Sequence, residues 1–474
     1  MLQCDMIIGG EKISATDSFD VVNPASGEAF ASCQLGTASD VDAAVVAARA
    51  AFPEWSGMAD EKRVEMISAL IPALEARMPE FMQLVTQESG KPMGGLNGVG
   101  SGMEVGGAMA WIGATAALKP TVEVAHEDDN VKIEVRRRPL GVVGSITPWN
   151  WPLMITIWHV IPALRAGNTV VLKPSEYTPV AVTRFAELVN EILPAGVLNL
   201  VLGAGEVGSA IASHTGIDKV VFTGSSRTGR RVMESASTNL KRLTLELGGN
   251  DAGIVLPDID VEAMAPKLFA ACFHNNGQTC AALKRLYVHE SIYDDVAEAI
   301  AAQAREVVVG DGLDEDTQLG PIQNLAQLEI VKSLAQDAKD QGGNFLTGGN
   351  QIDRPGYFFE PTVVTGLSNG SRLVDEEPFG PIVPIIKYSD LDEVLERAND
   401  SESGLGGSIW SSDPEKAAEL VARMECGTVW VNDHAGLNPN APFGGIKQSG
   451  FGVEFGEWGL DEFSALQTVW LSKA

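Results

Sequence analysis

The fold is decided by the stretch GVVGSITPWNWPLMITIWHVIPALRAGNTVVLK, residues 141–173. It begins and ends with short β-rich runs, 141–147 and 169–173, and a turn followed by an apolar helical segment lies between them. This order is typical of a strand, a crossover helix and a second, parallel strand. Further strand-like runs occur at 198–202, 219–223 and 243–247. The chain therefore predicts an α/β fold whose parallel sheet carries helices on both faces.

Polar residues and glycines follow the carboxyl ends of these strands. Open α/β sheets bind their ligands beyond this edge. The residues placed there by the pattern are Asn150, Lys173, Glu176, Gly224, Ser225 and Glu246. We therefore expect the functional site at this edge of the sheet.

The remaining chain predicts helices before this region and a second α/β region after it. The first 110 residues read as a short strand pair followed by helices, with Ser39 as the cap of one helix and a second helix over about 60–78. From about residue 250, strands are predicted at 285–289, 382–388, 406–410 and 427–432.

A hairpin is predicted over 121–138, with its turn at Asp128, Asp129 and Asn130. The segment 465–473 reads as a closing strand. The hairpin has too few apolar residues to form a core alone, so two interpretations stand: an arm that packs on another subunit, or a surface hairpin.

Composition excludes several classes of protein. The formal net charge of −29 argues against binding to nucleic acid or to an anionic membrane surface, because both need a basic footprint. No run of 18 apolar residues occurs, the first twelve residues lack the features of a signal peptide, and the five cysteines form no CxxC pair. We therefore expect a cytoplasmic protein without a bound metal.

Three residues are candidates for the chemistry. Cys280 lies in the polar loop GQTC, unlike a core cysteine such as Cys272, and it needs a base or a lowered pKa to act as a nucleophile. Glu246 ends an apolar strand, where burial would raise its pKa toward that of a general base. Asn150 lies in the rigid turn TPWNWP, where its amide could stabilise an oxyanion. Taken singly, each residue more often has only a structural role.

Two glycine-rich loops could bind a dinucleotide. Residues 203–208 match GxGxxG but lack the acidic residue expected about 20 positions later. FTGSSRTGR, 222–230, offers Gly224 and a helix start near Thr228. Lys173 and Glu176 in KPSE suit ribose hydroxyls, and a glutamate there favours NAD over NADP. The six histidines show neither metal-ligand spacing nor an evident catalytic role.

Seven motifs in this order resemble the aldehyde dehydrogenase superfamily, in particular its non-acylating, NAD(P)-dependent members, and the similarity extends over roughly residues 5–470. The motifs are TPWNWP, KPSE, FTGSSRTG, LELGGND, GQTC, EEPFGP and PFGGIKQSGFG. The resemblance favours the 222–230 loop for the pyrophosphate and supports the arm interpretation of 121–138.

The resemblance implies a role for each matching residue. It implies that Cys280 is the nucleophile, Glu246 the general base, Asn150 the oxyanion donor together with the Cys280 amide, and Glu454 a carboxylate that helps to relay protons. The implied cofactor-binding residues are Thr147, Trp149, Lys173, Ser175, Glu176, Gly205, Gly224, Ser225, Leu247, Glu377 and Phe379. The implied aldehyde pocket consists of Trp151, Ile155, Trp158, Thr279, Ala281, Leu437 and Phe443.

The resemblance also implies three structural parts. A Rossmann-type cofactor domain is expected over 1–120 and 139–247, with 436–463 returning to it. A catalytic domain is expected over 248–435, and an oligomerisation arm over 121–138 and 464–474. A homodimer or homotetramer is therefore expected.

The implied reaction is oxidation of an aldehyde to a carboxylic acid with NAD, although NADP stays open, through a cysteine thiohemiacetal and a thioester that water hydrolyses. The apolar pocket, which lacks an arginine, favours an apolar or aromatic aldehyde. Two other classes were weighed: a cofactor-independent thiol esterase or acyltransferase, and a catalytically silent relative.

Overall fold

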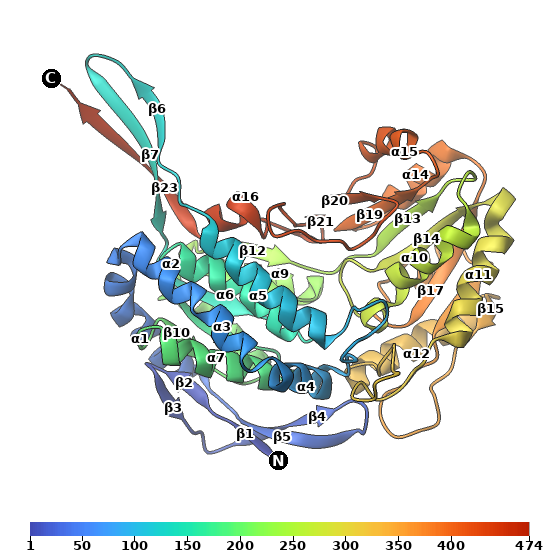
Figure 1. The fold of residues 1–474 in the computed structure, drawn as a ribbon, viewed down its shortest axis with the longest axis horizontal. Helices are drawn as coiled ribbons and strands as arrows, with labels where there is room; N and C mark the ends of the chain where they lie inside the picture. Colours follow the sequence, from blue (N-terminus) through green and yellow to red (C-terminus); the bar gives the residue numbers. More distant parts are fainter. Residues whose placement is uncertain (474) are drawn as a thin grey trace.

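The structure is a computed structural model that describes residues 1–473. Two large sheets, each covered by helices, make up the body, and a thin three-stranded sheet projects away from it (Figure 1). This arrangement confirms the predicted α/β fold class.

The first sheet contains the five strands predicted between residues 141 and 247, each with ends within two residues of the prediction. Its middle is parallel, and the short strands at its margins, β22, β2 and β3, pair antiparallel. In spatial order the strands are β22 (Gly450–Phe451), β12 (Arg242–Glu246), β11 (Lys219–Thr223), β8 (Val142–Ile146), β9 (Thr169–Lys173), β10 (Leu198–Leu200), β2 (Met6–Ile8) and β3 (Glu11–Ile13).

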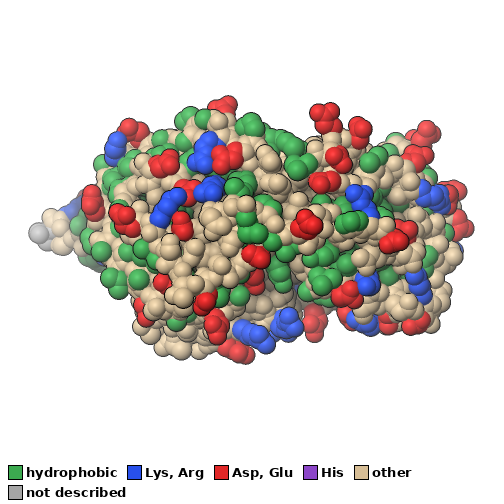
Figure 2. Space-filling model, turned by 90° about the horizontal axis from the view of Figure 1, so that it is seen from below, with side chains coloured by type: hydrophobic (Ala, Val, Ile, Leu, Met, Phe, Trp, Pro, Cys, Tyr) green, Lys and Arg blue, Asp and Glu red, His purple; other side chains and the backbone are tan. Residues whose placement is uncertain are grey.

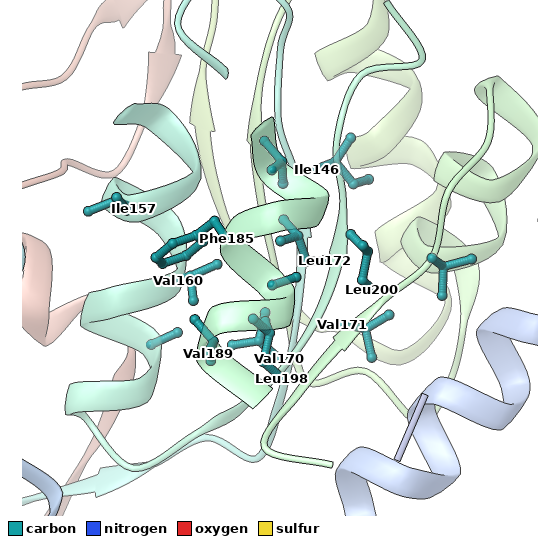
Figure 3. Close-up of a cluster of buried hydrophobic side chains, with 14 of the residues drawn as sticks. Ile146, Ile157, Val160, Val170, Val171, Leu172, Phe185, Val189, Leu198 and Leu200 are labelled. Carbon is teal, nitrogen blue, oxygen red and sulfur yellow. The ribbon is translucent and has the colours of Figure 1, made fainter. Parts of the chain in front are cut away.

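The core of this region lies between the sheet and its helices (Figure 3). Phe185 and Val189 of helix α7 (Val180–Ile192) belong to the same buried cluster as Val170 and Leu172 of β9. Helix α6 (Pro152–Arg165) is buried at every position except Pro162. A helix covered on all sides needs no polar face, which explains the nearly continuous apolar run of its sequence.

The other helices of this region complete both faces of the sheet. They are α1 (Ala38–Gly57), α2 (Asp60–Ser68), α3 (Leu70–Glu75), α4 (Met78–Ser89), α5 (Ser101–Ala117), α8 (Gly205–Ser213), α9 (Ser226–Ala236) and the late helix α16 (Gly456–Asp461).

Two helix predictions near the N-terminus were wrong in detail. Helix α1 is capped by Thr37 and not by Ser39, which lies inside the helix; the Thr37 amide donates to Oδ2 of Asp40 at 2.8 Å. The single helix predicted over 60–78 is divided into α2 and α3. Pro72 has no N–H to donate to the carbonyl of Ser68, which is the residue where α2 ends.

The N-terminal segment forms five short strands, more than the predicted pair. Besides β2 and β3, these are β1 (Leu2–Cys4), β4 (Ser18–Asn23) and β5 (Glu28–Gln34), which form a small separate sheet in the order β1-β5-β4.

The second sheet contains the four strands predicted after residue 250 and three that were not predicted, β13, β15 and β16. In spatial order its strands are β15 (Asn344–Thr347), β16 (Thr362–Thr365), β17 (Ile382–Tyr388), β14 (Leu283–His289), β13 (Asp251–Val255), β19 (Gly406–Trp410) and β20 (Thr428–Val431). Its helices are α10 (Val261–Phe273), α11 (Tyr293–Glu306), α12 (Leu325–Asp340), α13 (Arg372–Asp375), α14 (Leu391–Asn399) and α15 (Pro414–Val421).

The predicted hairpin and closing strand pair with each other. β6 (Glu123–Glu127) and β7 (Val131–Pro139) meet at the predicted turn, where Oδ1 of Asp128 accepts the amides of Asn130 and Val131. β23 (Ser464–Ser472) pairs along the whole of β7. The resulting sheet projects from the body with Trp470 and Leu466 exposed (Figure 1). Ala474, the last residue of the predicted arm, lies outside the described residues.

Charged side chains are dispersed over the surface. On the face shown in Figure 2, acidic groups are scattered between Lys and Arg side chains and small apolar areas. Among residues 1–473, no helix has the length and apolar composition needed to cross a bilayer.

Gly450 holds the C-terminal segment against β12, opposite Glu246. Its φ is +125°, and a Cβ there would lie 1.8 Å from the carbonyl oxygen of Leu245. We predict that Gly450→Ala lowers the free energy of unfolding by roughly 1–3 kcal/mol, because the backbone must leave its conformation or its partner. Chemical denaturation measures this change. Gly57→Ala is the control, because that position is open and helical; an equal effect of both substitutions would contradict the prediction.

Candidate active site

The carboxyl ends of the parallel strands in the first sheet meet at one edge, as predicted. Thr147 follows β8, Lys173 ends β9, Gly224 follows β11 and Glu246 ends β12. Adjacent strands in parallel register bring these positions together, since Ile146 pairs with Lys173 and Thr223 with Glu246. The sheet therefore gathers residues that are up to 99 positions apart in the chain.

A buried ion pair, Lys91–Glu104, holds the turn that carries Asn150. Lys91 and Glu104 have no exposed side-chain surface, and the Lys91 ammonium also donates to the Asn150 carbonyl at 3.0 Å. The second oxygen of Glu104 accepts the amides of Leu153 and Met154, at the first turn of α6. A carboxylate in this position satisfies the unpaired N–H groups of a helix N-terminus.

The same turn contacts the loop that carries Cys280. The Asn150 side chain donates from Nδ2 to the carbonyl of Gln278 at 3.0 Å, and the Trp151 indole donates to Oγ1 of Thr279 at 3.1 Å. Before them, Asn275 and Asn276 have φ values of 50° and 59°, a left-handed conformation that Asn tolerates better than most residues. This bend after α10 turns Cys280 toward Asn150.

Burial decides the protonation of the Cys280 thiol. Desolvation raises the pKa of Cys280 to about 12, and the charges of Glu246 and Glu377 act in the same direction. The ammonium of Lys284 opposes them; it donates to the carbonyl of Cys280 at 2.7 Å. The thiol therefore stays protonated near neutral pH until a base or a change in its surroundings favours the thiolate.

Glu246 and Glu454 form a buried acidic pair. Both residues are at least nine-tenths buried, and Oε1 of Glu246 has no hydrogen-bond partner among the described residues. Desolvation, followed by the charge of Glu454, raises the pKa of Glu246 well above its ordinary value. A carboxyl group of this kind can take up a proton near neutral pH, as general bases in enzymes do.

His159 extends this pair into the interior. Its Nε2 lies 3.2 Å from Oε1 of Glu454 and 2.9 Å from Oγ1 of Thr223, and its Nδ1 lies 3.1 Å from Oγ of Ser145. The His159 side chain is completely buried. Polar groups thus continue from Glu246 into the core of the first sheet.

The residues predicted for the adenosine side of a cofactor lie around the ends of β9 and β11. Lys173 is buried, and desolvation lowers its pKa; its Nζ donates to the Pro174 carbonyl and lies 3.6 Å from Glu176. Ser175 is buried beside it. Ser225 caps α9 by accepting the Thr228 amide, so this helix begins at Ser226, slightly earlier than predicted. Gly205 begins α8, and a side chain there would meet no atom within 4 Å.

Residues from the second region complete the edge. The rings of Trp149 and Phe379 meet edge to face with centroids 5.2 Å apart. Oε1 of Glu377 accepts from Lys284 at 2.6 Å and from the Gly249 amide at 3.3 Å. Leu247 is buried against Gly229 of α9. Of these contacts, the Trp149–Phe379 pair joins the two regions, and Glu377 contacts the segment that follows β12.

A cavity of about 440 Å³ opens beside Cys280. All seven residues predicted for the aldehyde pocket line it, together with others that were not predicted. The additional residues include Trp111, Met154, His274 and His434, and the charged residues Lys267 and Asp433. The pocket is therefore less uniformly apolar than the seven predicted residues suggested.

Sequence reasoning assigned no role to the histidines, yet three of the six lie at this site: His159 beside Glu454, and His274 and His434 at the cavity. It also missed Lys91, Glu104 and Lys284. Of these, only Lys284 carried a sequence signal, its position four residues after Cys280. Among residues 1–473, no cluster of His, Cys, Asp or Glu could hold a metal ion.

Comparison with known proteins identifies the family of this chain. The model of the aldehyde dehydrogenase family matches residues 12–469. The chain belongs to the aldehyde dehydrogenase family. It is 38% identical over 480 residues to the phenylacetaldehyde dehydrogenase of Pseudomonas fluorescens, covering 98% of this chain and 95% of the relative. It is 37% identical over 464 residues to the chloroplastic betaine aldehyde dehydrogenase of Beta vulgaris, covering 95% and 92%.

Solved structures of family members have the same fold. An aldehyde dehydrogenase from Bacillus cereus, solved as an NAD+ complex, superposes with a TM-score of 0.95 at 36% identity and covers 99% of this chain and 96% of its own. These findings confirm the family and the fold class that the seven motifs predicted.

The buried Lys91–Glu104 pair supports a prediction on the stability of the protein. Lys91→Met should lower the free energy of unfolding by about 3–5 kcal/mol, because it leaves the Glu104 carboxylate buried without a counter-ion. Urea denaturation measures the loss, and the double variant Lys91→Met/Glu104→Leu should recover much of it. Lys62→Met, which removes an exposed pair with Glu65, is the control and should change little. Equal losses in the two single variants would contradict the prediction.

Proposed function

We propose that this aldehyde dehydrogenase oxidises an aldehyde to its carboxylic acid with NAD(P), using Cys280 as a covalent nucleophile. The observation that carries the proposal is the meeting of Cys280 with Asn150 and Glu246. The Asn150 side chain donates to Gln278, two residues before Cys280, and the charge of Glu246 acts on the Cys280 thiol.

In the proposed reaction, the Cys280 thiol gives its proton to Glu246, and the thiolate attacks the aldehyde carbon and forms a thiohemiacetal. Loss of a hydride from that carbon to the bound dinucleotide would then give the thioester. The developing oxyanion accepts the second N–H of the Asn150 amide, whose first N–H is held by Gln278. The Cys280 amide is the second donor; no described residue accepts its hydrogen bond. Because both donors are fixed before the substrate arrives, they need little reorganisation during the reaction.

Glu246 acts in the hydrolysis of the thioester. It removes a proton from a water molecule, the resulting hydroxide attacks the acyl carbon, and the Cys280 thiolate leaves. The raised pKa of Glu246 suits this role, since a carboxylate of ordinary pKa is a weak base near neutral pH. Glu454, with His159 behind it, can take this proton over from Glu246.

The residues at the edge of the first sheet fit a nicotinamide dinucleotide. Lys173 and Glu176 offer a donor and an acceptor for ribose hydroxyls, and the N-terminus of α9 after Gly224 offers amides to a pyrophosphate. Glu377 and Phe379 approach the reacting side from the second region. When bound, the cofactor supplies the hydride acceptor. Glu176 would repel a ribose phosphate, so the proposal favours NAD.

These positions support separate roles for the two regions. We assign cofactor binding to residues 1–120 and 139–247, to which β22 and α16 within 436–463 return, and we assign Cys280 to a catalytic domain over 248–435. We assign pairing with further copies of this chain to the arm of 121–138 and 464–474, which the structure describes up to residue 473. Exposed Trp470 and Leu466 are the apolar surface that such pairing would cover.

The substrate is proposed to be an apolar or aromatic aldehyde. Trp111, Trp151, Trp158 and Phe443 are among the residues that line the cavity, and no arginine lines it. Relatives act on chemically different aldehydes by name, one on phenylacetaldehyde and one on betaine aldehyde. The proposal requires a higher kcat/KM for benzaldehyde or octanal than for succinic semialdehyde.

The first test uses a panel of these aldehydes with NAD and with NADP, and it measures reduction of the cofactor by its absorbance. We predict that Cys280→Ser abolishes NADH formation, because a serine hydroxyl in this site lacks both the acidity and the nucleophilicity of a thiol. Cys426→Ser is the matched control, since Cys426 is half-buried and does not line the cavity beside Cys280. Activity that survives in Cys280→Ser would contradict the mechanism.

The Glu246–Glu454 pair predicts a shift in the pH dependence. The charge of Glu454 raises the pKa of Glu246, so Glu454→Gln should lower that pKa. Since Glu246 acts deprotonated, the acidic limb of kcat should move to lower pH, whatever happens to its height. Glu457→Gln, at an exposed position three residues away, should leave the limb in place. A limb that stays, or moves to higher pH, in Glu454→Gln would show that the two carboxyl groups are not coupled.

A further inference from the structure

His274 lies inside the aldehyde cavity but has no part in the mechanism above. It follows α10 directly and is nine-tenths buried, and its side chain lines the same cavity as Cys280. Lys267, Ala270 and Ala271 of α10 line the cavity with it. Their spacing places all four on one face of the helix and its extension, opposite the tryptophan wall.

The tautomer of His274 is fixed by the backbone. Its Nδ1 lies 2.9 Å from the carbonyl oxygen of Ala270, and a carbonyl can only accept, so Nδ1 carries the hydrogen. Burial lowers the pKa of His274 to about 4, so the ring is neutral near pH 7. In a neutral ring with its hydrogen on Nδ1, Nε2 has a lone pair and no hydrogen. His274 is therefore a hydrogen-bond acceptor.

This acceptor has no partner in the protein. Among residues 1–473, none hydrogen-bonds to Nε2 of His274, and this atom is not sealed from solvent as the unpartnered indole nitrogens of Trp111 and Trp158 are. Because Nε2 lies across the ring from the Ala270 contact and His274 lines the cavity, a ligand in the cavity can approach this atom.

The other polar groups of the cavity are hydrogen-bonded, sealed from solvent or exposed at its rim. Nδ1 of His434 lies 2.9 Å from Oγ of Ser408, and Oγ1 of Thr279 accepts from Trp151. Nε2 of His434 has no hydrogen bond among the described residues but is sealed from solvent. Lys267, Asp433 and Asn97 are exposed. Nε2 of His274 is thus the polar side-chain atom left open within a largely apolar wall that includes three tryptophans.

We propose that His274 selects aldehydes that carry a hydroxyl group away from the reacting carbonyl, and that hydroxylated aromatic aldehydes are the substrate class of this enzyme. The inference rests on the proposed function of the Cys280 site. The aromatic wall takes the ring of the substrate, and Nε2 of His274 accepts from the hydroxyl group. A buried acceptor left without a donor costs free energy, so an aldehyde that lacks this group binds less well.

The test compares substrates that differ only in this group. Para- and meta-hydroxyphenylacetaldehyde donate a hydrogen bond, the methoxy analogues only accept one, and phenylacetaldehyde does neither. In the wild-type enzyme, kcat/KM for the better hydroxylated isomer should exceed that for its methoxy analogue and for phenylacetaldehyde by about tenfold, the effect of one hydrogen bond. A ratio near one for both isomers would overturn the proposal.

Variants then assign the preference to His274. His274→Phe should abolish the ratio, because it keeps a ring but removes the acceptor, and His274→Gln should restore part of it through its amide oxygen. His289→Phe, a histidine on β14 outside the cavity, should keep the wild-type ratio. A ratio that His274→Phe leaves intact would overturn the proposal.

Two further readouts keep the outcome clear. The ratio should be steady from about pH 6 to about pH 9, because a neutral acceptor does not titrate there; a preference that appears only when imidazole protonates would overturn the proposal. Para-cresol should also inhibit aldehyde oxidation more strongly than para-methoxytoluene. This comparison uses only the wild-type enzyme, so it does not depend on whether a variant folds. Failure of the proposed function is distinct, since phenylacetaldehyde itself would then yield no NADH.

Discussion

The buried ion pair of Lys91 and Glu104 is the interaction on which the site depends. Glu104 binds the first amides of α6, and Lys91 binds the Asn150 carbonyl while its ammonium lies 3.3 Å from the centre of the Trp151 ring. Asn150 and Trp151 in turn contact the backbone and side chain next to Cys280. Burial of an ion pair of this kind costs desolvation free energy, and the pair in turn holds the Asn150 turn in a single conformation.

That turn also joins the two halves of the molecule. It extends from the first sheet, whereas Cys280 belongs to the loop between α10 and β14 of the second. The contact between the rings of Trp149 and Phe379 adds a further connection. Catalytic groups on different sheets keep their geometry only if such contacts hold the sheets together, because a displacement of about 1 Å can cost a large part of the rate.

Electrostatics at the site follow from burying several acidic groups together. Glu246, Glu377 and the Cys280 thiol all have raised pKa values, with desolvation as the first cause in each. Lys284 is the nearby cation that lowers two of these values. A site of this kind favours neutral forms at rest. It therefore suits chemistry in which a thiol and a carboxyl group exchange protons in the course of the reaction.

The sequence by itself determined the first sheet, the projecting hairpin and the family. Short β-rich apolar runs, glycine turns and ordered motifs are local signals, so β8 to β12 were predicted without coordinates and Cys280 and Glu246 were singled out as candidates. Two local signals were interpreted wrongly, because Pro72 divides a helix that looked continuous and Thr37, with Asp40, caps α1. Contacts between residues far apart in the chain have no local signal. Only the tertiary structure brought Lys91 to Asn150, 59 positions away, and His159 to Glu454. It alone decided the protonation of Glu246, Cys280 and His274, because desolvation depends on what surrounds a group in space and not on its neighbours in the chain.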